Sequence, residues 1–358
     1  MFAVIMAGGA GTRFWPVSRK TRPKQFLNIT GKGPMVVETC NRLSPLVSDE
    51  EMILVLGKEH LREAEDLFND RRVHILAETV GRNTAPCIGL GAIYAKDLGC
   101  DRAIAFLPAD HFIGNPSPFI DCLRAAGELA DSGGIVTIGI IPNRPETGYG
   151  YIRKDGKPID LNGLKAFRVS KFVEKPDLEK ARDYIASGNF FWNGGIFVAK
   201  PEIILQEIKN LLPELYRGLM RLKNVMGTAQ FQPELDQIYR ELEGISFDYG
   251  IMERTNEKIH VLPCECGWSD VGSWESLYEL RSADLDANQN LAEGETLLID
   301  CKHSFISSKG GRLLTCLGLK RCLVVDTPET ILVADLNRSQ DIKKIVEQLK
   351  KRGKEKLL

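Results

Sequence analysis

Three features are missing from this chain of 358 residues. No apolar run approaches the ~20 residues that a membrane-spanning helix requires. The chain has no excess of one charge either, because 47 basic and 48 acidic residues give a net charge of −1. It therefore lacks the overall positive charge that attracts nucleic acid. A cleavable signal peptide is also not expected, since the polar turn at residues 8–13 interrupts the first apolar residues at once. We therefore expect a cytoplasmic protein that binds neither a membrane nor nucleic acid.

Histidine and cysteine do not form a metal-binding pattern. The chain has five histidines and nine cysteines, and Cys264 and Cys266 are the only close pair, without the second pair or the spaced histidines of a zinc site. Scattered cysteines in odd number favour reduced thiols that fill the core over a disulfide framework. Neither a zinc site nor a disulfide framework is therefore expected.

The most distinctive stretch covers residues 7–26 and reads AGGAGTRFWPVSRKTRPKQF. It follows residues 2–6, an apolar run that is short and β-branched enough to be a first buried strand. A Rossmann phosphate loop would need a third glycine where this chain has Phe14, and a Walker loop would need Gly-Lys-Ser/Thr after its spacer. Neither of these two phosphate loops is present.

The stretch nevertheless suits an anion. Gly8, Gly9 and Gly11 let the backbone turn tightly and bring bare N–H groups close to a phosphate. Arg13 and Lys24 add positive charge, with no carboxylate between them. An anion with several phosphates is the expected occupant, although a glycine-rich turn alone is also typical of an ordinary tight turn.

The first ~140 residues alternate between strand-like and helix-like segments, which is the pattern of βαβ units and a parallel sheet. The expected strands are 2–6, 52–56, 73–77, 103–107 and 135–141, and the expected helices are 35–46, 59–68, 85–98 and 119–130. We predict an α/β fold with a Rossmann-like mixed, mostly parallel sheet flanked by helices. Polar clusters follow three of the strands, at 8–13, 78–84 and 110–111. Because ligands of such sheets lie beyond the carboxyl ends of the strands, the clusters predict one shared pocket.

The pattern changes after residue 146. Strands are expected at 148–153, 166–173, 190–198 and 259–262, and helical segments at 178–186, 203–211, 235–242 and 247–254. A polar stretch at 282–290 is typical of a linker, and four short apolar strands (296–299, 312–317, 322–325 and 331–333) and a helix at 341–350 follow. We predict a catalytic domain at residues 1–285 and a small β-rich C-terminal domain at 286–358, in which the strand spacing suggests a short β-helix.

Two aspartates from distant segments are candidate metal ligands. Asp110 directly follows an apolar strand, where a partly buried carboxylate is costly unless it is hydrogen-bonded or holds a cation. Asp270 lies in a turn framed by glycine and tryptophan at residues 267–274. Mg²⁺ takes one or two carboxylates together with phosphate oxygens and water, which suits this pair. Either aspartate alone is equally typical of a helix cap or a turn.

The order of the motifs resembles the sugar-nucleotide pyrophosphorylases, nucleotidyltransferases that join a nucleoside triphosphate to a sugar 1-phosphate. The resemblance rests on GGAGTR at 8–13, on Pro16 and on Pro23-Lys24, and it extends over residues 1–285. The ending PKQF at 23–26 is most similar to the branch that makes GDP-mannose. The resemblance implies the GT-A-like fold of that family and a Mg²⁺-dependent transfer of GMP from GTP to α-D-mannose 1-phosphate, with release of pyrophosphate.

The resemblance also implies roles for individual residues. Asp110 and Asp270 would hold Mg²⁺, and the catalytic set would be Arg13, Lys24, Asp110 and Lys175. Nucleotide contacts would come from Gly8, Gly9, Gly11, Thr12, Arg13, Glu78, Gly81, Asn83 and Thr84, with Glu78 accepting hydrogen bonds from guanine. Sugar-phosphate contacts would come from Gly148, Glu174, Lys175 and Asn193.

Plainer interpretations of several motifs remain open. Asn83 or Thr84 is also typical of a helix N-cap, and Ser246 of the cap of a following helix. His111 is expected to be a structural neighbour only, because an attacking phosphate is already ionised and needs no base.

Other functions also remain open. A pyrophosphorylase that uses UTP, dTTP or CTP would carry the same phosphate loop, and a non-catalytic nucleotide-sugar sensor would share the fold. A sensor is disfavoured because it is expected to have lost one of Arg13, Lys24, Asp110 and Asp270, which are all present. A bifunctional isomerase would need a further domain for which too few residues remain. A homodimer is a candidate assembly, because a β-rich C-terminal domain often serves assembly in this superfamily.

Overall fold

The computed structural model describes residues 1–9 and 11–358, so Ala10 of the predicted glycine turn lies outside the described residues. The chain divides into two compact units. The first consists of Met1–Gly8, Thr39–Ala109 and Ile113–Trp268, and the second of Gly9–Glu38, Asp110–Phe112 and Ser269–Leu358. The second unit therefore combines the phosphate-loop segment with the C-terminal region. The predicted division at residues 285 and 286 stays a prediction.

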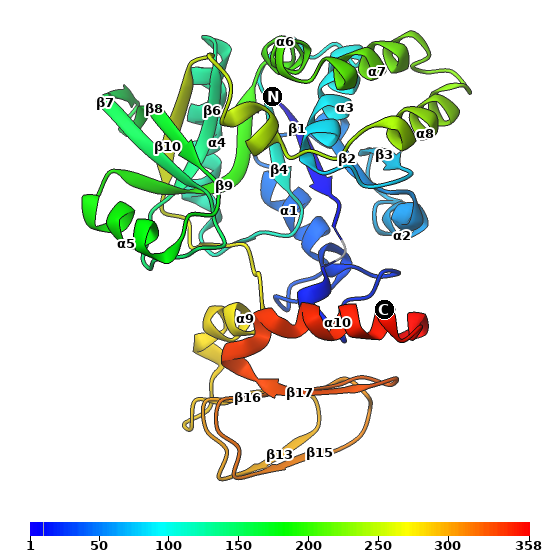
Figure 1. The fold of residues 1–358 in the computed structure, drawn as a ribbon, viewed down its shortest axis with the longest axis vertical. Coiled ribbons are helices and arrows are strands. Elements are labelled where there is room, and N and C mark those ends of the chain that lie inside the picture. Colours follow the sequence, from blue (N-terminus) through cyan, green and yellow to red (C-terminus); the bar gives the residue numbers. More distant parts are fainter. Residues whose placement is uncertain (10) are drawn as a thin grey trace. The chain divides into compact units, whose positions relative to one another are not determined.

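The first unit is built on a nine-stranded mixed sheet (Figure 1). In spatial order its strands are β3 (His74–Glu78), β2 (Met52–Gly57), β1 (Phe2–Ala7), β4 (Ile104–Pro108), β9 (Phe190–Ala199), β6 (Ile135–Ile140), β10 (Ile259–Cys264), β8 (Leu164–Val173) and β7 (Tyr151–Leu161). All strands except β9 and β8 run in one direction. The predicted mostly parallel, mixed sheet is confirmed.

The strands β1 to β4 form because their apolar, β-branched residues are buried on both faces, as in a parallel sheet covered by helices. Four of the six residues of β1 and five of the six residues of β2 are buried. Since β3, β2, β1 and β4 are parallel neighbours, their carboxyl ends lie at one edge of the sheet. Glu78 is the last residue of β3, and Gly8 follows β1 at the same edge.

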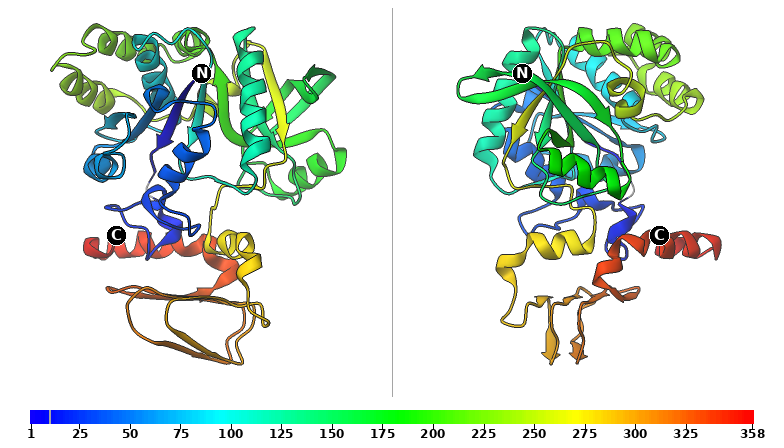
Figure 2. Two further views of the ribbon diagram at one scale, coloured as in Figure 1. Left: turned by 180° about the vertical axis from the view of Figure 1, so that it is seen from behind. Right: turned by 60° about the vertical axis from the view of Figure 1, so that its left-hand side comes forward.

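Helices cover both faces of this sheet (Figures 1 and 2). On one face α3 (Thr84–Asp97) packs against β1 and β2, and α6 (Pro201–Leu211) and α7 (Pro213–Asn224) pack against α3. On the other face α4 (Pro116–Asp131) packs against β6, β9 and β10. The remaining helices are α2 (Leu61–Leu67), α5 (Leu178–Ser187) and α8 (Phe231–Glu241), and α1 (Met35–Leu43) leads from the second unit into the first. A π-helical turn covers Asp248–Met252.

The C-terminal part of the second unit is a stack of short coils. Its strands are β12 (Leu291–Glu293), β13 (Thr296–Ile299), β14 (Phe305–Ser308), β15 (Leu314–Leu317), β16 (Cys322–Asp326) and β17 (Ile331–Asp335), accompanied by α9 (Trp274–Leu280) and α10 (Ile342–Lys351). Leu291, Phe305 and Leu323 occupy one register across β12, β14 and β16 and are buried. The small β-rich C-terminal region is therefore confirmed.

One hydrophobic core joins the C-terminal coils to the phosphate-loop segment of the second unit. Phe14 and Trp15 pack in it with Trp274 and Phe305, and the Phe14 and Trp274 rings lie 5.1 Å apart. Two-residue strands, β5 (Phe112–Ile113) and β11 (Trp268–Ser269), lie where the chain passes between the units. In the described part of the chain, no helix has both the length and the apolar character needed to traverse a bilayer.

Candidate active site

The second unit brings together three of the predicted site residues, Lys24, Asp110 and Asp270. The Lys24 ammonium donates to the Asp110 carboxylate at 2.9 Å, to the Asp110 carbonyl at 2.8 Å and to the Asp270 carbonyl at 2.5 Å. An ammonium group has three N–H donors, so these protein oxygens match its full donor capacity. Lys24 is only 5% exposed, so its side chain connects the segments of Asp110 and Asp270 in the interior of the second unit.

Gly11 connects the glycine turn to this cluster. Its backbone has a φ of +54°, and a Cβ added there would lie 2.7 Å from the Lys24 Cβ and 2.8 Å from the Lys24 nitrogen. Only glycine lets the turn pass so close to Lys24. The Ser18 hydroxyl donates to the Gly11 carbonyl at 2.6 Å, which fixes the same turn.

Asp110 is held in its ionised form. Burial alone would raise the pKa of Asp110, but the Lys24 ammonium, the neighbouring His111 and the hydrogen bond from Lys24 outweigh it, and the pKa is lowered. The side chain still keeps 35% of its surface exposed. An ionised and accessible carboxylate fits a hard divalent cation that also takes phosphate oxygens.

Asp270 lies in a strained turn. The next residue, Val271, is fully buried and has a φ of +45°, which is unusual for a β-branched side chain. The Gly272 N–H donates to Asp270 Oδ1 at 3.1 Å, and a Cβ at Gly272 would lie 2.6 Å from Asp270 Oδ2. A side chain at residue 272 would therefore collide with the Asp270 carboxylate.

The C-terminal region holds the phosphate-loop segment at several points of the second unit. The exposed Arg13 donates to the Gln340 side chain at 3.4 Å, and the Trp15 indole donates to the Leu357 carbonyl at 2.7 Å. Thr12 and Arg13 lie in a 3₁₀ turn that contacts α10. The C-terminal coils thus contribute to the shape of the predicted phosphate site, a role for which the sequence gives no signal.

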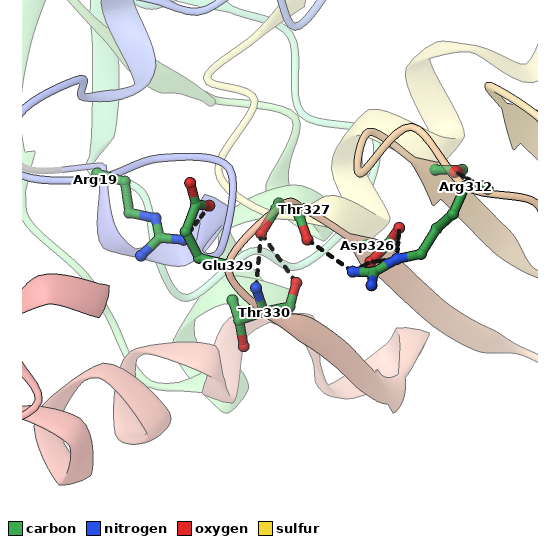
Figure 3. A network of polar contacts seen from close by, with 7 residues as sticks. Arg19, Arg312, Asp326, Thr327, Glu329 and Thr330 are labelled. Atoms are coloured by element: carbon green, nitrogen blue, oxygen red, sulfur yellow. Dashed lines mark hydrogen bonds and ion pairs between the residues drawn. The ribbon is translucent and has the colours of Figure 1, made fainter.

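A further contact of this kind involves Arg19, which pairs with Glu329 at 3.4 Å (Figure 3). Glu329 lies in the turn between β16 and β17, where Thr327 accepts a hydrogen bond from the Thr330 N–H at 3.3 Å. Arg312 donates to the fully buried Asp326 at 2.6 Å and to the Thr327 carbonyl at 3.2 Å. This network fixes the turn that presents Glu329.

In the first unit Glu78 ends β3 and is only 5% exposed. Burial raises the pKa of Glu78 to about 7, against the lowering effect of the nearby Tyr239 hydroxyl. The two groups do not reach hydrogen-bond geometry, and within the described residues neither Glu78 Oε1 nor the Tyr239 hydroxyl has a hydrogen-bond partner. A buried oxygen of this kind normally finds a donor, so Glu78 is suited to accept one from a ligand.

The loop after Glu78 leads into α3. Asn83 has a φ of +69° and caps the helix, since its side-chain oxygen accepts from the Thr84 N–H at 2.9 Å. The Thr84 hydroxyl accepts from the Phe247 N–H at 2.8 Å. The capping interpretation of Asn83 is confirmed, while Val80 and Gly81 between Glu78 and the cap are exposed.

The first unit also assembles the predicted sugar-phosphate residues. Lys175 pairs with Glu174 at 2.7 Å and keeps 57% of its side-chain surface exposed. Its backbone has a φ of +47°, and its N–H donates to the Tyr149 carbonyl at 3.2 Å. The Asn193 side chain donates to Asp248 at 2.7 Å. Asp248, on the π-helical turn, was not singled out from the sequence.

The glycine that permits close approach in this group is Gly150. A Cβ at Gly150 would lie 2.4 Å from Glu174 Oε2 and 3.1 Å from the Asn193 Cβ. Gly148, the predicted contact, is exposed and its N–H donates to the Glu146 side chain at 3.1 Å. Glu174, Lys175 and Asn193 therefore converge because Gly150 has no side chain.

Asp248 predicts a pH dependence of stability. Burial first, and then the Glu174 carboxylate, raise its pKa to about 6 against the effects of Asn193 and Lys175. A raised pKa means that the folded state binds the Asp248 proton more tightly than the unfolded state does. The stability that this proton contributes is therefore fully present below pH ~4 and is lost as the pH rises through ~6. We expect Asp248→Asn to match the wild type in thermal unfolding at pH 4 and to exceed it by roughly 1–3 kcal/mol at pH 8.

Asp183→Asn, at an exposed position of α5, is the control for this comparison and should show no such pH-dependent gain. An Asp248→Asn protein whose stability differs from the wild type by the same amount at both pH values would contradict the assignment of the raised pKa to Asp248.

The predicted close pair of cysteines has a third neighbour. The Cys264 thiol interacts with those of Cys122, on α4, and Cys266, and lowers the pKa of each of these two. All nine cysteines are free thiols. Across residues 1–9 and 11–358, no group of three or more histidine, cysteine, aspartate or glutamate side chains has an arrangement that could hold a metal ion. A cation at Asp110 and Asp270 would thus need further oxygens from its substrates.

Comparison with known proteins identifies the family. A nucleotidyl transferase model matches residues 2–287, and a model described as a MannoseP isomerase/GMP-like beta-helix domain matches residues 294–349. The mannose-1-phosphate guanylyltransferase of Escherichia coli is 38% identical over 98% of this chain and 74% of its own. The mannose-1-phosphate guanylyltransferase ManC of Salmonella typhimurium is 39% identical over 99% of this chain and 74% of its own.

A solved structure extends the similarity to the fold. The crystal structure of a Thermus thermophilus protein, described as a mannose-1-phosphate geranyltransferase, has a TM-score of 0.86 and 32% identity, and the match covers 98% of this chain and 99% of that one. The family expected from the phosphate-loop motif is confirmed. The chain is an enzyme that belongs to the nucleotidyl transferase family and, within it, to the mannose-1-phosphate guanylyltransferases.

Proposed function

We propose that this enzyme transfers GMP from GTP to α-D-mannose 1-phosphate and releases pyrophosphate. The proposal is carried by the nearly full-length similarity, at 38% identity, to a protein named mannose-1-phosphate guanylyltransferase. An oxygen of the sugar phosphate attacks the α-phosphorus of GTP in line, and the bond to the pyrophosphate oxygen breaks. Because the attacking oxygen is already ionised, catalysis consists of holding two anions together and stabilising the transferred charge.

Asp110 and Asp270 would hold a divalent cation, for which we propose Mg²⁺. Two observations support this assignment: Lys24 links the Asp110 carboxylate to the backbone carbonyl of Asp270, and the Asp110 carboxylate is accessible. When bound, the ion would supply positive charge that offsets the negative charge of the phosphates. Lys24 keeps Asp110 ionised and ties it to the Asp270 turn, while the exposed Arg13 neutralises the triphosphate.

In the first unit, we propose that Lys175 tethers the sugar phosphate and that Asn193 and Glu174 contact its hydroxyl groups. The 57% exposure of the Lys175 side chain supports a role on an anionic substrate. Glu78 would accept hydrogen bonds from guanine N1–H and N2–H₂, and its partnerless Oε1 supports that role. The exposed Gly81 and the cap residues Asn83 and Thr84 would complete the nucleotide contacts of this loop.

We also propose a cytoplasmic location, because GTP and sugar phosphates are cytoplasmic metabolites and the free thiols suit a reducing compartment. The homodimer stays a prediction.

The deciding experiment is a pyrophosphate-release assay with the purified enzyme and Mg²⁺. GTP, UTP, dTTP and CTP are each combined with the 1-phosphates of mannose and glucose. We expect release to be strongest with GTP and mannose 1-phosphate. Faster release with another pair would retain the nucleotidyl transfer but reject the guanine or mannose assignment. Tight GTP binding without release from any pair would favour a nucleotide-sugar sensor.

A further inference from the structure

The loop at residues 78–84 is held at both ends by α8 and the segment that follows it, all within the first unit. In Figure 1, α8 lies beside β3. Gln232 on α8 donates to the Ala77 carbonyl at 3.1 Å, which ties the end of β3 to the helix. The helix has no part in the motifs that identified the family.

Asp236 is the first anchor of this loop. Its Oδ1 accepts a short hydrogen bond from the Thr79 hydroxyl and another from Gln232 at 2.8 Å. Its Oδ2 pairs with Lys58 at 3.1 Å. A carboxylate with both oxygens occupied by charge-assisted bonds is held rigidly. Thr79, directly after Glu78, is therefore fixed to α8.

Arg82 is the second anchor. Its guanidinium donates to the carbonyls of Tyr239 at 2.6 Å and Arg240 at 2.9 Å, in the last turn of α8, where carbonyls have no partner within the helix. The Arg82 carbonyl accepts from the Ile245 N–H at 3.1 Å, and the Ile245 carbonyl accepts from the Ala85 N–H at 3.1 Å. The far end of the loop is thus fixed to α8 and to the segment that follows it.

Between the two anchors the loop presents Val80 and Gly81 at the surface. A loop that discriminates bases must keep its donors and acceptors in place, because a loop free to move would adapt to several bases. The contacts of Asp236 and Arg82 hold the loop in place and do not involve the exposed Val80 and Gly81. The arrangement is that of a support for a binding loop.

We propose that α8 sets the base selectivity of the enzyme, with Asp236 and Arg82 as positioning residues that hold the loop at 78–84 in its base-reading shape. This inference rests on the proposed function, since it takes residues 78–84 as the loop that contacts the nucleobase. The ligand class is a purine nucleoside triphosphate with hydrogen-bonding groups at positions 1 and 2 of the base. Neither residue touches the reacting phosphates.

The test compares kcat/KM for GTP, for ITP, whose base lacks only the 2-amino group, and for UTP. Asp236→Ala and Arg82→Leu each remove one anchor, and Thr79→Val removes a single hydroxyl without changing the shape of the side chain. We expect each to lower the ratio of kcat/KM for GTP to that for ITP about tenfold, mainly through the KM for GTP, because a misplaced contact costs up to about 10²-fold. Gln237→Ala, at an exposed position of α8, should keep the wild-type ratio.

Three outcomes separate this inference from the proposed function. A wild-type enzyme without preference for GTP over UTP would reject the proposed function itself. A wild-type enzyme that prefers GTP over UTP but not over ITP would overturn the inference alone, because the loop would then not read the 2-amino group. A wild-type enzyme that prefers GTP, together with folded variants that lose activity equally on all three nucleotides, would overturn the inference alone, because α8 would then only stabilise the fold. Thermal unfolding identifies variants that do not fold, and in that case the nearly isosteric Thr79→Val decides the question.

Discussion

The Asp110→Asn variant is expected to lose about 10²- to 10³-fold in kcat while it keeps its fold. Asparagine preserves the size of the side chain and an oxygen for the bond from Lys24, which measures 2.9 Å in the wild type. It removes the negative charge that a divalent cation requires. Turnover with GTP and mannose 1-phosphate is measured across a range of Mg²⁺ concentrations, and the half-saturating concentration is expected to rise as kcat falls.

Asp101→Asn is the matched control, because Asp101 is an exposed aspartate shortly before β4 and should leave both quantities unchanged. Asp270→Asn is expected to resemble Asp110→Asn, since the two aspartates would share the ion. If Asp110→Asn kept nearly wild-type turnover at limiting Mg²⁺, Asp110 could not be a metal ligand.

The first half of the fold could be predicted from the sequence because its signals are local. Strands β1 to β4 and β6 were each predicted to within one residue at either end. Because these strands are buried on both faces, their sequences are continuous apolar runs, and helical segments and turn residues separate them. The fold class followed from this alternation of strands and helices, and the family followed from the motif that begins after β1 and continues to Phe26.

Elements whose stability comes from distant contacts were missed or misjudged. Strand β7 (Tyr151–Leu161) extends well past the predicted end at residue 153, since its second half is exposed and polar and has no apolar alternation. Helix α7 was not predicted. Its Pro213 comes almost directly after α6, where a proline is typical of the end of a helix, although proline is also favoured in the first turn of a new helix. In the C-terminal coils β12 and β14 were missed, being three or four residues long and stabilised by neighbouring coils.

In the candidate site, too, the residue types could be predicted from the sequence, whereas the contacts between the residues could not. The sequence identified Lys24, Asp110 and Asp270 by residue type, but their joining through one ammonium depends on tertiary structure. Asp248 lay in a motif whose preferred interpretation was a helix start, and that interpretation is partly right, because the Tyr249 N–H donates to the Ser246 hydroxyl at 3.2 Å. No sequence signal marks its bond to Asn193.

The second large effect is expected at Lys24. Replacing Lys24 with methionine keeps an unbranched side chain of similar length but removes the donors of three hydrogen bonds, to the carboxylate and carbonyl of Asp110 and to the Asp270 carbonyl. The Asp110 carboxylate loses its counter-charge, which costs about 3–5 kcal/mol for a fully buried pair. Since the Asp110 side chain is 35% exposed, we expect a smaller loss of stability, about 2–3 kcal/mol, measured by denaturant unfolding.

Activity should fall further than this loss of stability explains. We expect kcat/KM for Lys24→Met to drop by about 10²- to 10³-fold under conditions where the protein is folded, because Asp110 and the Asp270 turn are no longer held together. Lys20→Met, at an exposed lysine of the same segment, should behave as the wild type. Lys24→Arg should not restore activity, since a planar guanidinium cannot replace a point charge with three diverging donors.

A double-mutant cycle separates the positioning role of Lys24 from a direct effect of its charge on the triphosphate. If the lysine acts through Asp110, its removal should cost much less in an Asp110→Asn background, so the two effects on kcat/KM should be far from additive. If Lys24 acts only by its charge on the triphosphate, the effects should add. Additive losses would therefore contradict the positioning role, and a Lys24→Arg enzyme with wild-type turnover would contradict the importance of the three-acceptor geometry.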